Sequence, residues 1–250
     1  MLARFAVEQG HEVTVFSRNP PAEAADGVRY LRADATTGEG LAEALGGSDV
    51  VIDCLEGRSG KALKQYADAG ARLLAAAATA RVRRAVALSI INCDASTAAF
   101  YASKAAKERV YAASGLETVT VRASQFHSLV AAVFAAGAKV GLVPVIKGAA
   151  FQPISPAEVA LALLAEAVAP SPEPAGQRHR TVTVAGPEIR TMRELAESWR
   201  RITGRKGLVV EFPLPGAMGD YLRKGLNLAP ELRHGTETFE SWLAKRPDTL

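Results

Sequence analysis

Ser17 and Arg18 stand at the end of an apolar, β-rich run that occupies residues 12–16. A guanidinium at the end of a strand can bind a phosphate through charge-assisted hydrogen bonds, each worth roughly 1.5–3 kcal/mol. In a dinucleotide-binding unit an acidic residue at this position holds a ribose 2′-hydroxyl, whereas an arginine favours a 2′-phosphate. We therefore expect Ser17 and Arg18 to contact a phosphorylated adenosine. The alternative is a solvated arginine at a strand end.

Small or polar residues also stand at the ends of the next two apolar runs. Asp34 and Ala35 follow one run, and Cys54 and Leu55 end the other. We interpret Cys54 as a small buried residue that fills space in the core. A redox pair with Cys93, which follows the adjacent strand, is the alternative.

Strand-like and helix-like patterns alternate through the first half of the chain. A nearly continuous apolar run is typical of a strand that is covered on both faces. Repeated β-α-β units with such strands predict a Rossmann-like α/β fold, in which a doubly wound parallel sheet has right-handed crossovers. The predicted strands are 12–16, 28–33, 49–54, 84–89 and 117–122, and the predicted helices are 37–45, 60–80 and 99–114.

The regular alternation of strand-like and helix-like patterns ends after residue 123. We expect an NAD(P)-binding Rossmann-like core over residues 1–123 and a small α+β cap over residues 124–250, interleaved with the core. Two capping boxes, Ser155–Glu158 and Thr191–Glu194, predict helices that begin there. The other elements predicted after residue 123 are a helix over 124–138, extended segments near 142–146 and 151–154, strands over 180–185 and 208–212, and two short final helices.

Only ten residues precede His11, and their pattern is that of the end of a helix. In a dinucleotide-binding unit the first, central strand and its glycine-rich phosphate loop come before that helix. Without that strand, strands 12–16 and 49–54 lose a hydrogen-bonding partner. Each buried backbone group left unpaired costs about 1–3 kcal/mol of stability. Either the two half-sheets pair directly, or the sheet has a gap, or the natural protein carries about 15–20 further residues at its amino end. We favour the third account.

The composition is that of an ordinary soluble protein, with 48% hydrophobic and 22% charged residues. The net charge of +4 comes without a dense basic run, so we expect no nucleic-acid partner. The longest apolar stretch, residues 129–146, is interrupted by Gly137, Lys139, Gly141 and Pro144 and is a poor membrane span. No secretory signal and no metal-ligand spacing is recognisable, which favours a cytoplasmic protein without a metal.

Six motifs follow one another along nearly the whole chain: His11–Arg18, Gly46–Asp53, Val82–Ser89, Lys104–Glu108, Ser114–Arg122 and Gln125–His127. In order and spacing they resemble the atypical branch of the short-chain dehydrogenase/reductase superfamily, the NmrA-like NAD(P)-binding proteins. That family mixes reductases, isomerases and redox-sensing regulators without catalysis, so the resemblance predicts the fold better than the function.

The resemblance implies further contacts with a dinucleotide that lies across the carboxyl ends of the strands. Asp34 and Ala35 would lie near the adenine, Cys54 and Leu55 near a ribose, and Gln125 beside the nicotinamide. Taken by itself, Asp34 is equally well explained as an aspartate that caps a loop or a helix.

The resemblance also implies a catalytic serine and lysine. Ser89 matches the serine at a strand end, and Lys104 matches the lysine that holds the nicotinamide ribose, its alternative being a solvated lysine. The usual tyrosine stands four residues before that lysine, where this chain has Phe100. Tyr101 is displaced by one residue, about 100° around a helix, and should point away from the face of Lys104. His127 could replace the missing proton donor or be a structural histidine.

These observations leave two functions open. The first is an NADP(H)-dependent oxidoreductase that acts on a small carbonyl compound or a quinone. The second is a catalytically silent protein that senses NADP(H), which the phenylalanine at the tyrosine position favours.

Overall fold

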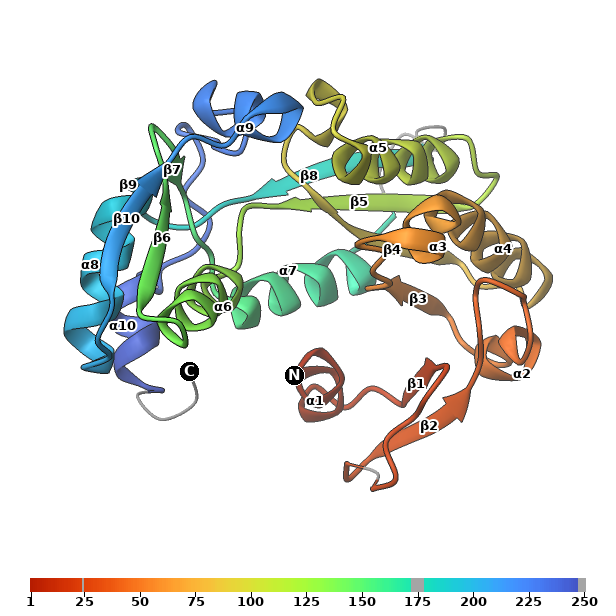
Figure 1. Cartoon of the computed structure of the whole chain (residues 1–250). Coiled ribbons are helices and arrows are strands. Elements are labelled where there is room, and N and C mark those ends of the chain that lie inside the picture. Colours follow the sequence, from red (N-terminus) through yellow and green to blue (C-terminus); the bar gives the residue numbers. More distant parts are fainter. Residues whose placement is uncertain (24, 172–177, 247–250) are drawn as a thin grey trace. The chain divides into compact units, whose positions relative to one another are not determined.

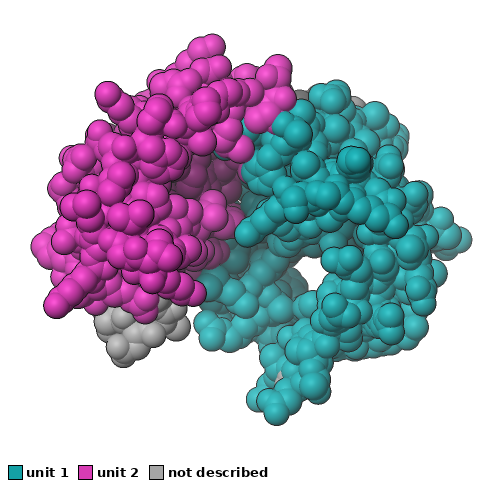
Figure 2. Space-filling view, in the orientation of Figure 1, with its two compact units in different colours: residues 1–89, 99–121, 160–182 teal, residues 90–98, 122–159, 183–250 magenta. Residues whose placement is uncertain are grey.

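The computed structural model describes the whole chain except residue 24, residues 172–177 and residues 247–250 (Figure 1). The described part divides into two compact units that interleave along the sequence (Figure 2). Unit 1 comprises residues 1–89, 99–121 and 160–182, and unit 2 comprises residues 90–98, 122–159 and 183–250. Within the described ranges no helix is long and apolar enough to cross a membrane.

The first strands form two separate sheets. β1 (Val13–Ser17) and β2 (Val28–Arg32) pair in parallel as a two-stranded sheet. β3 (Val50–Asp53) pairs in parallel with β4 (Arg84–Ile90) at one end of a four-stranded sheet. Since β1 and β3 belong to different sheets, direct pairing of the two half-sheets is wrong, and Figure 2 shows an opening through unit 1. The four-stranded sheet has the order β3-β4-β5-β8, with β5 at Glu117–Ala123 and β8 at His179–Val184.

Helices cover both faces of the four-stranded sheet. α4 (Tyr66–Thr79) and α5 (Ala99–Ala112) pack together on one face, and α7 (Pro156–Val168) lies on the other (Figure 1). Arg84 fixes α7, because its fully buried guanidinium donates to the carbonyl oxygens of Glu166 and Ala169 at 2.9 and 2.5 Å. The positive charge of Arg84 also interacts favourably with the negative, C-terminal end of the α7 dipole. The apolar core beneath α4 includes Leu41, Leu45, Val51, Leu73, Leu74, Ala77 and Ala85.

Two predicted helices of unit 1 are shorter than expected. The helix predicted over 37–45 is α2 (Leu41–Leu45), because Gly40 takes a left-handed conformation (φ 74°) where a Cβ would lie 2.4 Å from the Arg32 carbonyl oxygen. The helix predicted over 60–80 divides at Gln65 into α3 (Gly60–Lys64) and α4. α3 buries no residue, whereas α4 buries a face that begins with its first residue. α1 (Leu2–Glu8) precedes β1 and contacts it.

Unit 2 contains two small sheets surrounded by helices. β6 (Leu142–Ile146) pairs in parallel with β10 (Leu208–Phe212), and β7 (Ala150–Phe151) pairs antiparallel with β9 (Arg190–Thr191). The helices and the short 3-10 turn are η1 (Cys93–Ala95), α6 (His127–Ala138), α8 (Met192–Thr203), α9 (Gly216–Arg223) and α10 (Phe239–Ala244).

One of the two predicted capping boxes is confirmed. Thr191 and Glu194 cap α8 reciprocally, as expected. At the start of α7 the Ser155 hydroxyl caps the helix by accepting from the Ala157 N–H at 3.3 Å. The Glu158 carboxylate instead accepts hydrogen bonds from the backbone N–H groups of Thr236 and Glu237, at 2.6 and 3.0 Å, so the second half of the box is used for tertiary packing.

Candidate functional site

The ends of β1 and β2 bring together a carboxylate and two cations. Arg18 is exposed directly after β1, and Asp34 follows β2. Asp34 Oδ1 accepts a hydrogen bond of 2.7 Å from the backbone N–H of Thr36. That bond, together with the charges of Arg18 and Lys61, lowers the pKa of Asp34. Arg18 and Lys61 therefore lie within electrostatic reach of one carboxylate at the carboxyl ends of these strands.

The side chain of Asp34 closes the turn to Thr36, as its interpretation as a loop-capping aspartate expects, and Ala35 is buried beside it. The adenine contacts expected of both residues stay predictions. Lys61 was missed from the sequence, although it directly follows Gly60 at the start of α3. Its approach to Asp34 depends on the fold of the segment between β3 and α4, which spacing alone does not show.

Asp53, the last residue of β3, is the centre of a buried polar cluster. Its Oδ2 lies 2.5 Å from Lys107 Nζ and accepts a hydrogen bond of 2.7 Å from the Tyr111 hydroxyl. Its Oδ1 accepts from the backbone N–H of Leu55 at 2.9 Å. Burial and the neighbouring Asp53 carboxylate raise the pKa of Tyr111 well above its usual value. The cluster fixes the loop in which Cys54 lies and ties it to α5.

Lys104 is buried on the same face of α5, one turn earlier. Its ammonium forms an ion pair and a hydrogen bond with Glu56 and lies 3.8 Å from the centroid of the Tyr66 ring. The Phe100 ring centroid is 5.1 Å from the same nitrogen. Burial lowers the pKa of Lys104, and the contact with Glu56 opposes that shift. Lys104 is therefore no solvated lysine, and the rings of Tyr66 and Phe100 both lie beside its ammonium.

Ser89 and Lys104 line one small cavity. Its volume is about 10 Å³, which is about the space that one water needs. The two residues that sequence analysis paired as catalytic are thus brought together. Tyr66 of α4 also lines this cavity and was missed, because it lies 38 residues before Lys104 in the sequence. The remaining lining residues are Ala87, Leu88, Lys107 and Glu108.

Gln125 and His127 belong to unit 2. The Gln125 side-chain amide donates to the Asn227 carbonyl oxygen at 3.4 Å. His127 is fully buried, its Nε2 lies 2.9 Å from the Glu237 carbonyl oxygen, and the rings of Phe239 and Trp242 flank it at 5.7 Å. Burial lowers the pKa of His127. These contacts support the structural histidine and not the proton donor.

The cysteines have unlike surroundings. Cys54 is exposed, so its interpretation as a buried filler is wrong, whereas Cys93 is buried. Both are free thiols.

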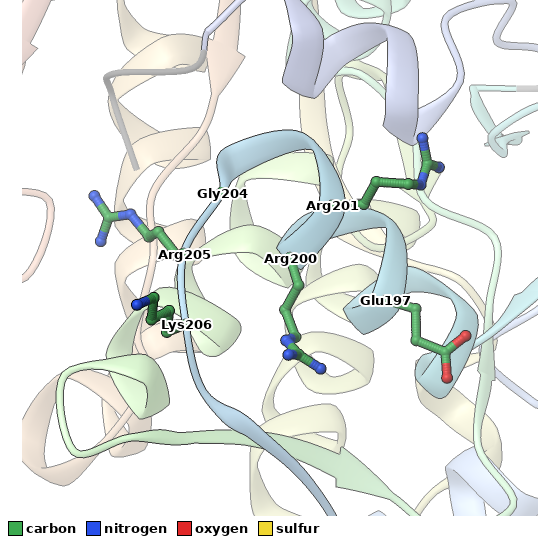
Figure 3. Close-up of a pocket in the computed structure, with 6 residues that line it drawn as sticks. All are labelled: Glu197, Arg200, Arg201, Gly204, Arg205 and Lys206. Atoms are coloured by element: carbon green, nitrogen blue, oxygen red, sulfur yellow. The ribbon is translucent and has the colours of Figure 1, made fainter.

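A second hollow, of about 380 Å³, lies at the C-terminal end of α8 in unit 2 (Figure 3). Figure 3 shows Arg201 pointing away from Arg205 and Lys206, and Arg201 is paired with Glu240 at 2.7 Å. Because these cations diverge, they make a solvated basic face and no convergent anion site. The hollow is lined by Glu197, Arg200, Arg201, Gly204, Arg205 and Lys206.

The sequence over residues 1–168 matches the model of a family described as NAD(P)H-binding. The chain belongs to this family. No curated protein matches the sequence.

Solved structures give the same fold. A nucleoside-diphosphate-sugar epimerase from Staphylococcus aureus matches with a TM-score of 0.74 and 15% identity over 97% of this chain and 94% of that one. An NADPH-dependent quinone oxidoreductase from Escherichia coli, complexed with NADPH, gives 0.73 and 20% over 98% and 96%. A triphenylmethane reductase from Citrobacter sp., complexed with NADP(H), gives 0.68 and 15% over 97% and 90%. The Rossmann-like α/β fold is thereby confirmed, and the family match confirms that the chain is an NAD(P)H-binding one.

The residues of this NAD(P)H-binding chain fit a dinucleotide at two places. Arg18 and Lys61 offer cations for phosphate at the end of β1, and Lys104 offers a buried ammonium next to Ser89. In both places the group offered to the dinucleotide is a side-chain cation.

Proposed function

We propose that this NAD(P)H-binding chain prefers NADP(H) and uses it to reduce a small carbonyl compound or a quinone. The observation that carries the preference is Arg18, which is exposed at the end of β1 and shares the neighbourhood of Asp34 with Lys61. A phosphate monoester brings about −1.5 to −2 charges to such a place, whereas the 2′-hydroxyl of NAD brings none. Two structural neighbours that were solved with NADPH or NADP(H) support the same preference.

Two groups of unit 1 would bind and orient the reactants. Lys104 would hold the hydroxyls of the nicotinamide ribose, and Ser89 would donate a hydrogen bond to the substrate oxygen. The bound NADPH supplies the hydride.

A silent NADP(H)-sensing protein is the second candidate, and the position of Phe100 favours it. The α5 residue four positions before Lys104 is Phe100, whose ring lies 5.1 Å from the ammonium and carries no hydroxyl for proton transfer. General acid–base help of this kind is typically worth 10²–10⁴-fold in rate.

Calorimetric titration with NADP and with NAD tests the cofactor preference. Arg18→Ala should weaken NADP binding roughly ten- to a hundredfold and leave NAD binding nearly unchanged. Lys61→Ala should weaken NADP binding less, because an exposed ammonium makes a less specific phosphate contact. Arg72→Ala, which removes an exposed arginine of α4, is the matched control. Tighter binding of NAD by the wild-type chain would refute the preference.

Turnover separates the two candidates. Consumption of NADPH in the presence of a panel of quinones and aldehydes supports the reductase. Tight NADP binding without consumption supports the sensor. Either function is proposed for a cytoplasmic protein whose partner is a small molecule and not a nucleic acid, as its composition indicates.

A further inference from the structure

The ammonium of Lys104 already has a carboxylate partner. Only 4% of the Lys104 side chain is exposed, against 44% of the Glu56 side chain, so Glu56 covers the pair on its solvent side. The other close neighbours of Nζ are the rings of Tyr66 and Phe100, which attract a cation but offer no conventional hydrogen-bond acceptor. Glu56 is thus a hydrogen-bond acceptor of Lys104.

Few contacts hold Glu56 in this position. Its other carboxylate oxygen lies 4.0 Å from Arg58, whose side chain is largely exposed. Its Oε1 also accepts from the neighbouring Gly57 N–H at 2.9 Å. Glu56 is the more exposed member of its pair with Lys104, so rotation of the Glu56 side chain toward solvent would uncover the ammonium on that side.

We propose that Glu56 is an internal substitute ligand, which occupies Lys104 until the ribose hydroxyls of a nicotinamide dinucleotide displace it. This inference rests on the proposed function, in which Lys104 binds that ribose. A buried ammonium needs a polar partner in every state, and Glu56 supplies one when no dinucleotide is bound. Binding then requires the state in which Glu56 has left, so the apparent affinity is reduced by the fraction of molecules in that state.

Glu56→Gln removes the ion pair and keeps the shape of the side chain. We expect it to bind NADP about two- to fivefold more tightly than the wild-type chain, the range of a partly exposed ion pair. Glu56→Asp keeps the charge but is one methylene shorter, so it should also bind NADP more tightly. Glu8→Gln removes an exposed carboxylate of α1 and should change nothing.

Adenosine 2′,5′-bisphosphate is the discriminating ligand, because it carries the phosphorylated adenosine but no nicotinamide ribose. We expect its affinity, measured by calorimetry on the same variants, to be insensitive to Glu56. If Glu56→Gln increases the affinity for NADP and for the bisphosphate equally, the variant acts through the loss of one negative charge and not through Lys104, and the inference is wrong. Unchanged or weaker NADP binding in that variant also overturns it, since Glu56 would then be neutral or a support for Lys104.

The proposed function fails in a different way. If neither the wild-type chain nor Glu56→Gln binds NADP, NAD or the bisphosphate, the dinucleotide site itself is refuted, and the displacement with it. Thermal unfolding checks that each variant folds. If Glu56→Gln does not fold, the same comparison is made with Glu56→Asp.

Discussion

Replacing Asp53 by asparagine tests the buried cluster at the end of β3. Asp53 is fully buried and faces the ammonium of Lys107 at 2.5 Å, with the Tyr111 hydroxyl at 2.7 Å. The Lys107 side chain is only 3% exposed. Asp53→Asn would therefore leave a buried ammonium without a counter-charge, while the side chain keeps its size.

The expected cost follows from this burial. Removing one partner of a buried pair typically costs about 3–5 kcal/mol, which for a chain of this size lowers Tm by roughly 6–20 °C. Lys107→Met should cost less, about 1–3 kcal/mol, because Asp53 keeps its hydrogen bonds from Tyr111 and Leu55. The double variant removes both charges, so its cost should fall well below the sum of the single costs.

Urea unfolding followed by circular dichroism measures all three variants. Glu39→Gln, at an exposed position after β2, is the control and should stay within about 0.5 kcal/mol of the wild-type chain. Strictly additive costs, or an Asp53→Asn variant as stable as this control, would refute the assignment of a buried ion pair.

Three further outcomes are expected. Arg84→Met should destabilise the chain by about 3–5 kcal/mol in chemical denaturation, because Glu117 and the last carbonyls of α7 lose a fully buried partner. Stability should fall as the pH decreases from about 7 to 5, because burial lowers the pKa of His127 and the unfolded chain, with a pKa of about 6.5, then binds more protons. His127→Gln should flatten this dependence in urea titrations, and an unchanged slope would contradict it. Phe100→Tyr places a phenol beside Lys104 and should raise NADPH turnover at least about tenfold, whereas unchanged turnover would argue against proton transfer at this face.

Local signals predicted the elements that depend on local interactions. Thr191 and Glu194 lie within one turn, so the sequence alone predicted their capping box, and α8 begins directly after Thr191 as expected. β10 likewise spans the predicted 208–212. The box at Ser155–Glu158 failed because its carboxylate has better partners in a distant segment, and no local pattern announces such competition.

Only part of the candidate site was predictable, because local patterns do not show which distant segments pack together. Ser89 and Lys104 were paired through motifs, and they do line one cavity. Glu56, Lys61 and Tyr66 were missed, since they come from a loop and two helices whose approach is decided by tertiary packing. A buried lysine requires compensation, but the sequence does not say which carboxylate provides it.

The two ends of the proposed cofactor site lie on different sheets of unit 1. Arg18 follows β1, whose strand partner in the described chain is β2, whereas Ser89 belongs to β4 of the four-stranded sheet. The hydrogen-bonded frame of a continuous sheet does not connect them, so their separation depends on helix packing against β1 and β2. A ligand that binds both ends would itself join the two sheets and stabilise the unit by about 2.7 kcal/mol at a hundred times its Kd. A fragment that reaches Arg18 alone makes no such connection, so comparing it with NADP separates affinity at one end from the joining of the sheets.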